Sequence, residues 1–374
     1  MPGELQSFLS LPAEAARRTG PLDQIVFSSR VRLARNIQGF AFPGWAKKPE
    51  RVRSLEVIRA AVEQLPPLAG AFSETMDSLS ALEKQILVER HLISREHAAK
   101  SGGSGLVIDR SEGVCVMINE EDHLRMQALR PGFQLAEVWQ LIDEIDTALE
   151  TRLPYAFSPD LGYLTACPTN VGTGIRVSAM LHLPGMVLAE LINPTIQSVN
   201  KLGLAVRGLY GEGTEALGNI FQVSNQMTLG ESEPEIVERL SKVVHQMIEH
   251  ETNARQKLLE EKPKVLFNHI GRAYGVLANA YSISSKEAMN LLSLVRLAHD
   301  LKMFPGVPRA LFDELILVTQ PAHLQRVHAG KLGAEERDVR RADLLRERLR
   351  DVPRPVPPQL TPPPTDATKG ASEE

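Results

Sequence analysis

Five arginines stand in short segments whose residue types suit phosphate binding. They are Arg30 and Arg32 in SSRVR, Arg125 in EEDHLR, Arg176 in GTGIRVSAM and Arg207 in VRGLYGEG. Arginine stays charged and offers its N–H donors in a planar fork that matches phosphate oxygens. Taken alone, each of these arginines is more easily explained as a solvent-exposed surface residue than as a phosphate ligand. Glycines beside Arg176 and Arg207 let backbone approach a ligand closely, so the set indicates a phosphate site.

Carboxylates follow two apolar runs. Glu120, Glu121 and Asp122 come directly after one, and Glu212 comes after another. A guanidinium is a poor nucleophile because its pKa is above about 12, so an enzyme that phosphorylates it must orient it with carboxylates and remove a proton. Acidic residues are also common at helix N-termini, where they interact favourably with the helix dipole. The segment 120–122 alone is compatible with either a helix N-terminus or a guanidinium site.

Two cysteines are too few for a disulfide framework. Cys167 lies in TACPTNVGTG, where Pro168 and two glycines predict a rigid turn. A thiolate beside arginines can hold a positive guanidinium. A lone cysteine is more often a core residue, and Cys115, alternating inside an apolar strand, fits that interpretation.

The composition is that of a globular chain. It has 374 residues, of which 43% are hydrophobic and 24% charged, enough for about two domains. A net charge of -4 gives no general attraction to nucleic acid or to an anionic membrane. Neither a signal peptide nor a long apolar span is apparent, which predicts a cytoplasmic protein.

Strand and helix patterns alternate through the first two thirds of the chain. Apolar alternation predicts extended segments at 24–36, 204–211 and 219–229, a hairpin at 105–121, and a strand pair formed by 162–169 and 174–185. Helical periodicity separates them. Short connections between strands predict an α+β domain over 21–255, with a mostly antiparallel sheet flanked by helices.

The last third has only helical patterns. They run to about Arg350 and predict a smaller all-α domain over 256–350. Residues 1–20 are expected to form an N-terminal arm. The segment 351–374 is rich in proline and small polar residues, and is expected to be a disordered tail.

The segments SSRVRLARN, INEEDHLRM, ACPTNVGTGIRVS and RGLYGEG occur in the order and spacing of the phosphagen (guanidino) kinase catalytic domain. The chain resembles that family over about residues 22–255. Four linked motifs are a far more specific signal than a lone glycine-rich loop. The resemblance implies a kinase that uses ATP and Mg²⁺ to phosphorylate a guanidinium.

The resemblance also implies roles for individual residues. Glu121 is similar to the family's guanidinium clamp and base, Glu212 to its second clamp, and Cys167 to its reactive cysteine. Glu120 resembles a carboxylate that orders the water shell of Mg²⁺. The residues implied to bind ATP are Ser28, Ser29, Arg30, Val31, Arg32, His91, Arg125, Arg176, Val177, Ser178, Ala179, Met180, Arg207, Gly208, Leu209, Tyr210, Gly211 and Glu212.

Departures from the small-molecule members narrow the resemblance. Only 27 residues precede Ser28, where those members have a helical domain, so an open cleft is expected. Met180 stands where they usually have a histidine. Near the C-terminus, ERDVRRADLL is similar to the phosphoarginine-binding motif of bacterial protein-arginine kinases, through the residues Arg337, Asp338, Arg341 and Ala342. Taken alone, that segment also fits an exposed helix with salt bridges.

The expected function is therefore transfer of the γ-phosphoryl group of ATP to arginine side chains of proteins. The family implies marking for Clp-type proteolysis or control of stress regulators, an allosteric phosphoarginine site and a homodimer. Implied partners are protein substrates with exposed arginine, a possible activator and Clp components, with no membrane or direct nucleic-acid binding. Two alternatives stay open: a kinase of a free guanidine such as arginine, and a silent adaptor that binds phosphoarginine.

Overall fold

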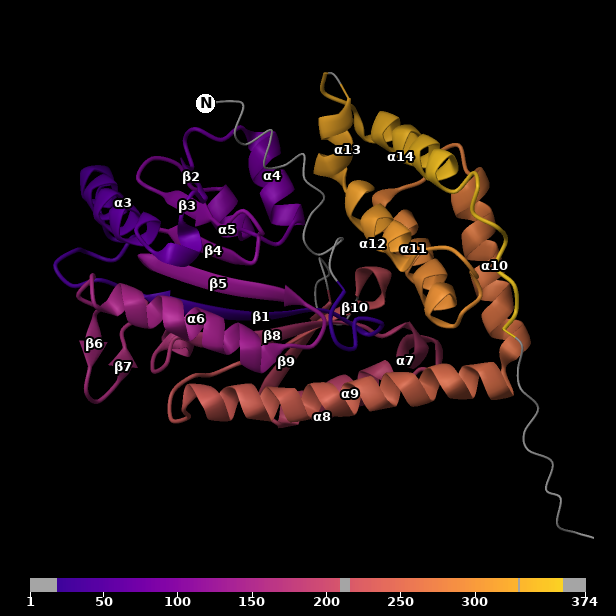
Figure 1. Cartoon of the computed structure of the whole chain (residues 1–374), viewed down its shortest axis with the longest axis horizontal. Helices are drawn as coiled ribbons and strands as arrows, with labels where there is room; N and C mark the ends of the chain where they lie inside the picture. The colour runs from indigo at the N-terminus through magenta and orange to yellow at the C-terminus, as the bar shows by residue number, and fades with distance from the viewer. Residues whose placement is uncertain (1–18, 209–215, 329, 359–374) are drawn as a thin grey trace, which may run out of the picture.

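A long antiparallel sheet lies at the centre of the structure, a computed structural model that describes residues 19–208, 216–328 and 330–358 (Figure 1). Its strand order is β2-β3-β4-β5-β1-β8-β10-β9. The strands are β1 (Val26–Arg35), β2 (Phe72–Thr75), β3 (Gly105–Ile108), β4 (Val114–Ile118), β5 (Leu124–Pro131), β8 (Ile175–His182), β9 (Leu204–Gly208) and β10 (Ile220–Asn225). A separate small hairpin pairs β6 (Phe157–Ser158) with β7 (Gly162–Tyr163).

Alternation along the central strands gives the sheet an apolar and a polar face. Val31 and Leu33 of β1 are almost fully buried, while Arg30 and Arg32 point to the opposite side. The register sets Arg32 directly opposite Arg176 on β8. Arginines of neighbouring strands therefore share one face.

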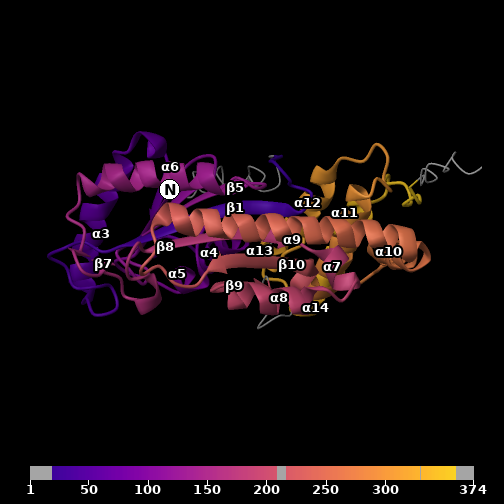
Figure 2. The same cartoon turned by 90° about the horizontal axis from the view of Figure 1, so that it is seen from below.

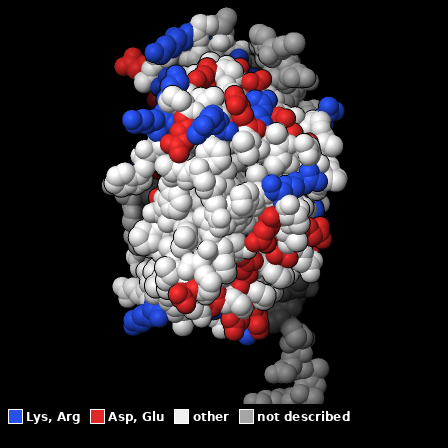
Figure 3. All heavy atoms as spheres, turned by 90° about the vertical axis from the view of Figure 1, so that its left-hand side faces the viewer, with Lys and Arg blue, Asp and Glu red and all other residues white. Residues whose placement is uncertain are grey.

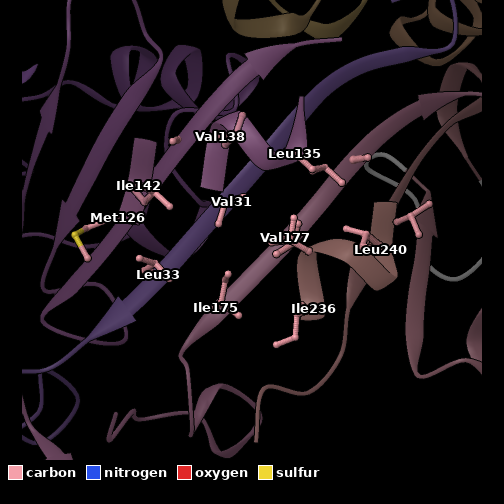
Figure 4. Packing of buried hydrophobic residues seen from close by; sticks show 14 of the residues in the cluster. Val31, Leu33, Met126, Leu135, Val138, Ile142, Ile175, Val177, Ile236 and Leu240 are labelled. Carbon is pink, nitrogen blue, oxygen red and sulfur yellow. The ribbon is translucent and has the colours of Figure 1, made fainter. Parts of the chain in front are cut away.

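Two helices cover the apolar face, α6 (Leu135–Glu150) and α9 (Glu233–Glu261). Figure 4 shows side chains of β1 and β8 facing those of both helices across this core. The view from below in Figure 2 shows α9 continuing past the sheet towards the helical part. Burial of this face rigidly fixes the strands that carry the arginines.

The remaining helices of the sheet-containing part are α3 (Lys48–Glu63), α4 (Ala81–Glu89), α5 (Arg95–Ala98), α7 (Pro184–Leu188) and α8 (Ile192–Lys201). The helical part contains α10 (Pro263–Asn279), α11 (Ser285–Asp300), α12 (Arg309–Val318), α13 (Pro321–Val327) and α14 (Ala334–Arg348). It has its own apolar core around Leu292, Phe312 and Leu345. The α9 helix runs through the predicted domain boundary at residue 255 and adds Leu258 and Leu259 to this second core.

The α+β class with an antiparallel sheet followed by helices is confirmed, but one predicted strand is wrong. In the segment 162–169 only Gly162–Tyr163 is a strand, and β8 pairs with β1 and β10 instead. Pro168 lacks a backbone donor, and Gly172 and Gly174 turn the chain at positive φ, which prevents a strand there. The short edge strand β2 was not predicted.

The predicted disordered tail begins too early. Val352 is buried in the helical core, its carbonyl accepts a hydrogen bond from Tyr274, and the Val356 amide donates to the Met303 carbonyl. The chain is therefore attached to the helical part at Val352 and Val356, whereas 359–374 and most of the predicted arm lie outside the described residues. Within the described ranges, no helix has both the length and the apolar content needed to cross a bilayer.

Candidate active site

The five arginines come from four strands and line one cavity of about 330 Å³ on the polar face. Arg30 and Arg32 lie on β1, flanked by Arg176 on β8 and Arg125 on β5. Arg207 lies near the end of β9, beyond β10. Strand register alone thus brings together residues from positions 30 to 207 of the chain.

Positive charge in this cavity is not neutralised by matching carboxylates. Burial and the nearby Arg125 lower the pKa of Arg30 to about 10. Burial, followed by the charges of Arg30, Arg125 and Arg176, lowers the pKa of Arg32 well below its ordinary value. The Nε of Arg32 is buried and has no hydrogen-bond partner in the described part of the chain. A multiply charged anion would relieve both the repulsion and the unpaired donor.

Neutral groups hold Arg30 and Arg176 in place. Arg30 donates to the Gln222 amide oxygen at 2.6 Å, and Arg176 donates to the Asn225 carbonyl at 2.7 Å. Such bonds fix the orientation of a guanidinium and leave its charge uncompensated. The arrangement is that of a preorganised cationic surface.

The carboxylates lie on the tight turn between β4 and β5. Asn119 opens the turn at a positive φ of 56°, and its side chain donates to the carbonyls of Arg51 and Gly103. Glu120 is buried and accepts hydrogen bonds from Arg125 at 2.5 and 2.7 Å, and from Ser94. Burial raises the pKa of Glu120, but Arg125 and Ser94 outweigh it, so the net shift is downward and Glu120 is anionic.

Glu121 has a different environment from its neighbour. It is exposed, lines both the arginine cavity and an adjoining one, and has no ion-pair partner among the residues that the structure describes. Partial burial, then the charges of Asp122 and Glu120, raise the pKa of Glu121 above its ordinary value. A carboxylate with a raised pKa that faces open space beside the arginines can accept a proton.

Asp122 connects this turn to the loop that carries Cys167. Its Oδ1 accepts hydrogen bonds from the Asn36 amide at 2.6 Å and from the Ala166 backbone at 2.7 Å. Cys167 is half-buried at the arginine cavity, with its Sγ 3.1 Å from the Thr169 hydroxyl. Cys115 is buried in β4, where burial raises the pKa of its thiol.

His91 lies beside the arginines although it follows a distant helix. Its φ is +59°, and its carbonyl accepts a hydrogen bond from Gln127 of β5 at 3.0 Å. Burial and the charge of Arg30 lower the pKa of His91 to about 4. Its imidazole is therefore neutral near pH 7.

Comparison with known proteins gives the site its context. A family model for the ATP:guanido phosphotransferase C-terminal catalytic domain matches residues 56–254, and one for the protein-arginine kinase McsB C-terminal domain matches 263–359. The protein-arginine kinase of Moorella thermoacetica is 48% identical over 335 residues, covering 88% of this chain and 95% of the relative. The chain belongs to the protein-arginine kinase family.

A second relative and a solved structure agree with this membership. The protein-arginine kinase of Geobacillus stearothermophilus is 50% identical over 333 residues, covering 88% of this chain and 92% of the relative. The crystal structure of lombricine kinase is similar with a TM-score of 0.55 and 26% identity, covering 64% of this chain and 70% of that one. The kinase class predicted from the four motifs is confirmed.

The individual nucleotide residues stay predictions, and the structure places them unevenly. Val31, Val177 and Ala179 point their side chains into the core, away from the arginine face, because they alternate with the polar residues of β1 and β8. The Ser29 hydroxyl donates to the Gly132 carbonyl and accepts from the Gln134 amide, so its bonds are structural. Ser28 is buried, and Ser178 and Met180 lie on the arginine face with Arg30.

Part of the predicted site cannot be placed. Glu212 and the preceding residues 209–211 lie outside the described residues, while Gly208 ends β9. Sequence reasoning missed Gln222 and Ser224 of β10, which line the cavity and alternate along the strand with buried Phe221 and Val223. Their period of two along an apolar strand was the signal that could have found them.

The RDVRRA segment forms part of α14, in the helical part of Figure 1. Arg341 is only 1% exposed and donates to the carbonyls of Thr319 and Ile283, and to Asp338 at 2.5 Å. Ala342 is buried beside it, and Arg337 donates to the Leu332 carbonyl. Arg341 thus ties α14 to its neighbours, and phosphoarginine binding by this segment stays a prediction.

Proposed function

We propose that this chain transfers the γ-phosphoryl group of ATP to the guanidinium of arginine residues in proteins. The observation that carries the proposal is a single cavity lined by five arginines, with the carboxylate of Glu121 at its edge and without an ion-pair partner among the described residues. Membership of the protein-arginine kinase family supports it. Phosphoryl transfer needs little more from a protein than alignment and charge stabilisation, and the cavity offers both.

The arginines would hold the triphosphate, and the Nε of Arg32, which has no hydrogen-bond partner within the described ranges, is one donor that fits it. Mg²⁺, when bound with ATP, neutralises charge on the phosphate oxygens. Among the described residues, no three His, Cys, Asp or Glu side chains are grouped so that they could hold a metal ion. We expect phosphate oxygens and water to supply most ligands of Mg²⁺. Glu120, anionic and held by Arg125, would orient that water.

The acceptor arginine would lie against Glu121, with Glu212 as the second clamp and Cys167 beside the guanidinium. One guanidinium nitrogen attacks the γ-phosphorus in line, the bond from phosphorus to the β–γ bridging oxygen breaks, and ADP leaves. The proton from the attacking nitrogen passes to the Glu121 carboxylate. No phosphorylated enzyme intermediate is needed.

The family resemblance supports further proposals. Arg337, Asp338, Arg341 and Ala342 would bind phosphoarginine as an allosteric signal, and the helical part would form a homodimer. The products would be substrates of Clp-type proteolysis or stress regulators with changed activity, and an activator protein would join the kinase in the cytoplasm.

The direct test supplies ATP with a labelled γ-phosphate and an arginine-bearing protein, with free arginine and a protein whose arginines are replaced by lysine as comparisons. Mass spectrometry under non-acidic conditions should find acid-labile phosphate on arginine only. Phosphate on free arginine alone would indicate a small-guanidine kinase. No incorporation, with phosphoarginine binding retained, would indicate an adaptor.

A further inference from the structure

A second cavity, of about 710 Å³, adjoins the arginine cavity and shares Glu120, Glu121 and Arg125 with it. Its opposite side is formed by Phe42 and Trp45, from the segment between β1 and α3. The volume is that of a site for a sizeable ligand, and one guanidinium would fill only a part of it. Whatever occupies the cavity next to Glu121 therefore extends beyond the reacting group.

Trp45 is unusual because its side chain is 91% exposed while its backbone is held in place. The Trp45 amide donates to the Phe42 carbonyl at 2.8 Å, and the Ala41 amide donates to the Glu50 carboxylate at 2.8 Å. Arg51 donates to the Ala46 carbonyl at 2.8 Å. An exposed tryptophan on a backbone held by hydrogen bonds is typical of a binding anchor, because covering it orders only the few torsions of its own side chain.

The side of the molecule that carries the segment between β1 and α3 also has a broad uncharged area, although the cavity itself is lined by charged residues. The segment between β1 and α3 lies at the left-hand edge of Figure 1, and Figure 3 looks onto that side, where a broad central area has no Lys, Arg, Asp or Glu. The β6–β7 hairpin of the same side adds Phe157 and Leu161, which are 52% and 47% exposed. Such a surface suits apolar parts of a partner.

Charge at the floor of the cavity has the opposite character. Three carboxylates, Glu96, Glu120 and Glu121, face two cations, Lys100 and Arg125, which leaves a formal charge of -1. Glu120 and Arg125 neutralise each other as an ion pair. The carboxylate of Glu121, which pairs with no cation in the described part of the chain, thus favours a cationic group at the floor, while the aromatic side favours an apolar one.

We propose that Trp45 and Phe42 form a docking site for an extended stretch of the acceptor polypeptide. A large apolar residue close to the acceptor arginine packs on Trp45, while the arginine reaches Glu121. This specificity rests on the proposed function. Trp45 and Phe42 line the same cavity as Glu121, so its occupant must also place a cation at the floor of that cavity. An acceptor chain with an arginine meets this requirement, which favours it over a second copy of the kinase.

Intrinsic fluorescence tests the docking site without any phosphoryl transfer. The chain has two tryptophans, so Trp139→Phe leaves Trp45 as the only indole. Trp139 lies half-buried on α6 and loses one hydrogen bond, to Glu233, in that variant. The probes are peptides with one arginine and a leucine at successive positions on either side, with an all-alanine peptide for comparison. We expect one leucine position to shift Trp45 emission to shorter wavelength and bind about tenfold more tightly.

Kinetics on the otherwise unmodified chain give the second measurement. Trp45→Ala should raise KM for the preferred peptide about tenfold and leave kcat and KM for ATP unchanged, and Trp45→Phe should restore most of the affinity. Leu202→Ala, which removes an exposed apolar side chain outside both cavities, is the matched control and should change nothing.

Several results would overturn the docking site. They are unchanged Trp45 emission on peptide binding, the same peptide affinity in Trp45→Ala, or an equal loss in Leu202→Ala. Emission that depends on protein concentration without peptide would assign the surface to a second copy instead. Trp45-dependent binding without phosphate incorporation would refute the proposed kinase activity and keep the docking site.

Discussion

Arginines on the sheet face and buried arginines elsewhere in the chain have opposite surroundings. Arg32 faces other arginines and keeps an unpaired Nε within the described structure. Arg296 of α11 is buried, but it pairs with Asp313 at 2.7 Å and donates to the carbonyls of Gln24 and Asp23. The guanidinium of Arg32 thus has a donor free for an anion within the described structure, whereas that of Arg296 is hydrogen-bonded by the protein itself.

The pKa shifts separate the two groups in the same way. Burial and like charges lower the pKa of Arg30 and of Arg32. Burial also lowers the pKa of Arg35, but Asp146 outweighs it and the net shift is upward. The hydrogen bond to Asp23 raises the pKa of Arg309. The uncompensated charge of Arg30 and Arg32 indicates a binding region, whereas the compensated charge of Arg35 and Arg309 belongs to the scaffold.

The largest effect is expected from Arg32→Met, which removes a site cation and keeps much of the side-chain volume. Transfer should fall about 10³-fold or more, the order of loss when an arginine that stabilises a transferring phosphoryl group is removed. The thermal midpoint should stay equal or rise, since repulsion among the arginines decreases. Initial rates and calorimetry measure both. A large fall in the midpoint with little loss of rate would place Arg32 in the scaffold.

Arg296→Met makes the reverse test. It breaks the ion pairs of buried Arg296 with Asp313 and Asp300 and removes the donor to the carbonyls of Gln24 and Asp23, although Asp313 keeps Arg309 as a partner. The free energy of unfolding should therefore fall by about 3–5 kcal/mol. Urea unfolding measures it. Arg340→Met, which removes an exposed arginine of α14 whose ion pair is with Asp343, three residues along the same helix at 3.9 Å, is the matched control and should change stability little. Equal effects of the two substitutions would remove the distinction between scaffold and surface arginines.

A smaller effect is expected from pH, through the carboxylate that faces the arginines. The pKa of Glu121 is raised above 4.5, and only its deprotonated form accepts a proton, so kcat/KM should rise with pH through a midpoint above 4.5. Asp122→Asn keeps an acceptor for the Ala166 amide and removes a like charge, so the midpoint should move to lower pH. A midpoint that is unchanged in Asp122→Asn would contradict this assignment of the shift.

Much of the sheet could be predicted because the alternation of polar and apolar residues along a strand is visible in the local sequence. Alternation places Arg30 and Arg32 opposite Val31 and Leu33, and that face assignment is what the structure has. The strand predicted over 162–169 was wrong. This segment forms a turn in which the Ala166 amide donates to the Asp122 carboxylate, a partner distant in sequence. Sequence patterns carry no record of such a partner.

The roles of arginines outside the sheet also depend on partners that are distant in sequence. Arg341 resembles a ligand-binding residue by motif, yet its donors reach Thr319, Ile283 and Asp338. Trp45 received no role from the sequence, because its exposure follows from how the segment after β1 folds back beside the turn of Glu121. Burial and partner identity are tertiary properties, and they distinguish a site arginine from a structural one.

The most direct test of the account is Glu121→Gln, assayed on an arginine-bearing protein with ATP binding measured by calorimetry. Glu137→Gln, an exposed carboxylate on α6, is the matched control. The account predicts that Glu121→Gln lowers transfer by about 10²–10⁴-fold, the usual contribution of a general base, with ATP affinity and thermal midpoint unchanged. Turnover close to that of the Glu137→Gln control would contradict it and remove Glu121 as the base.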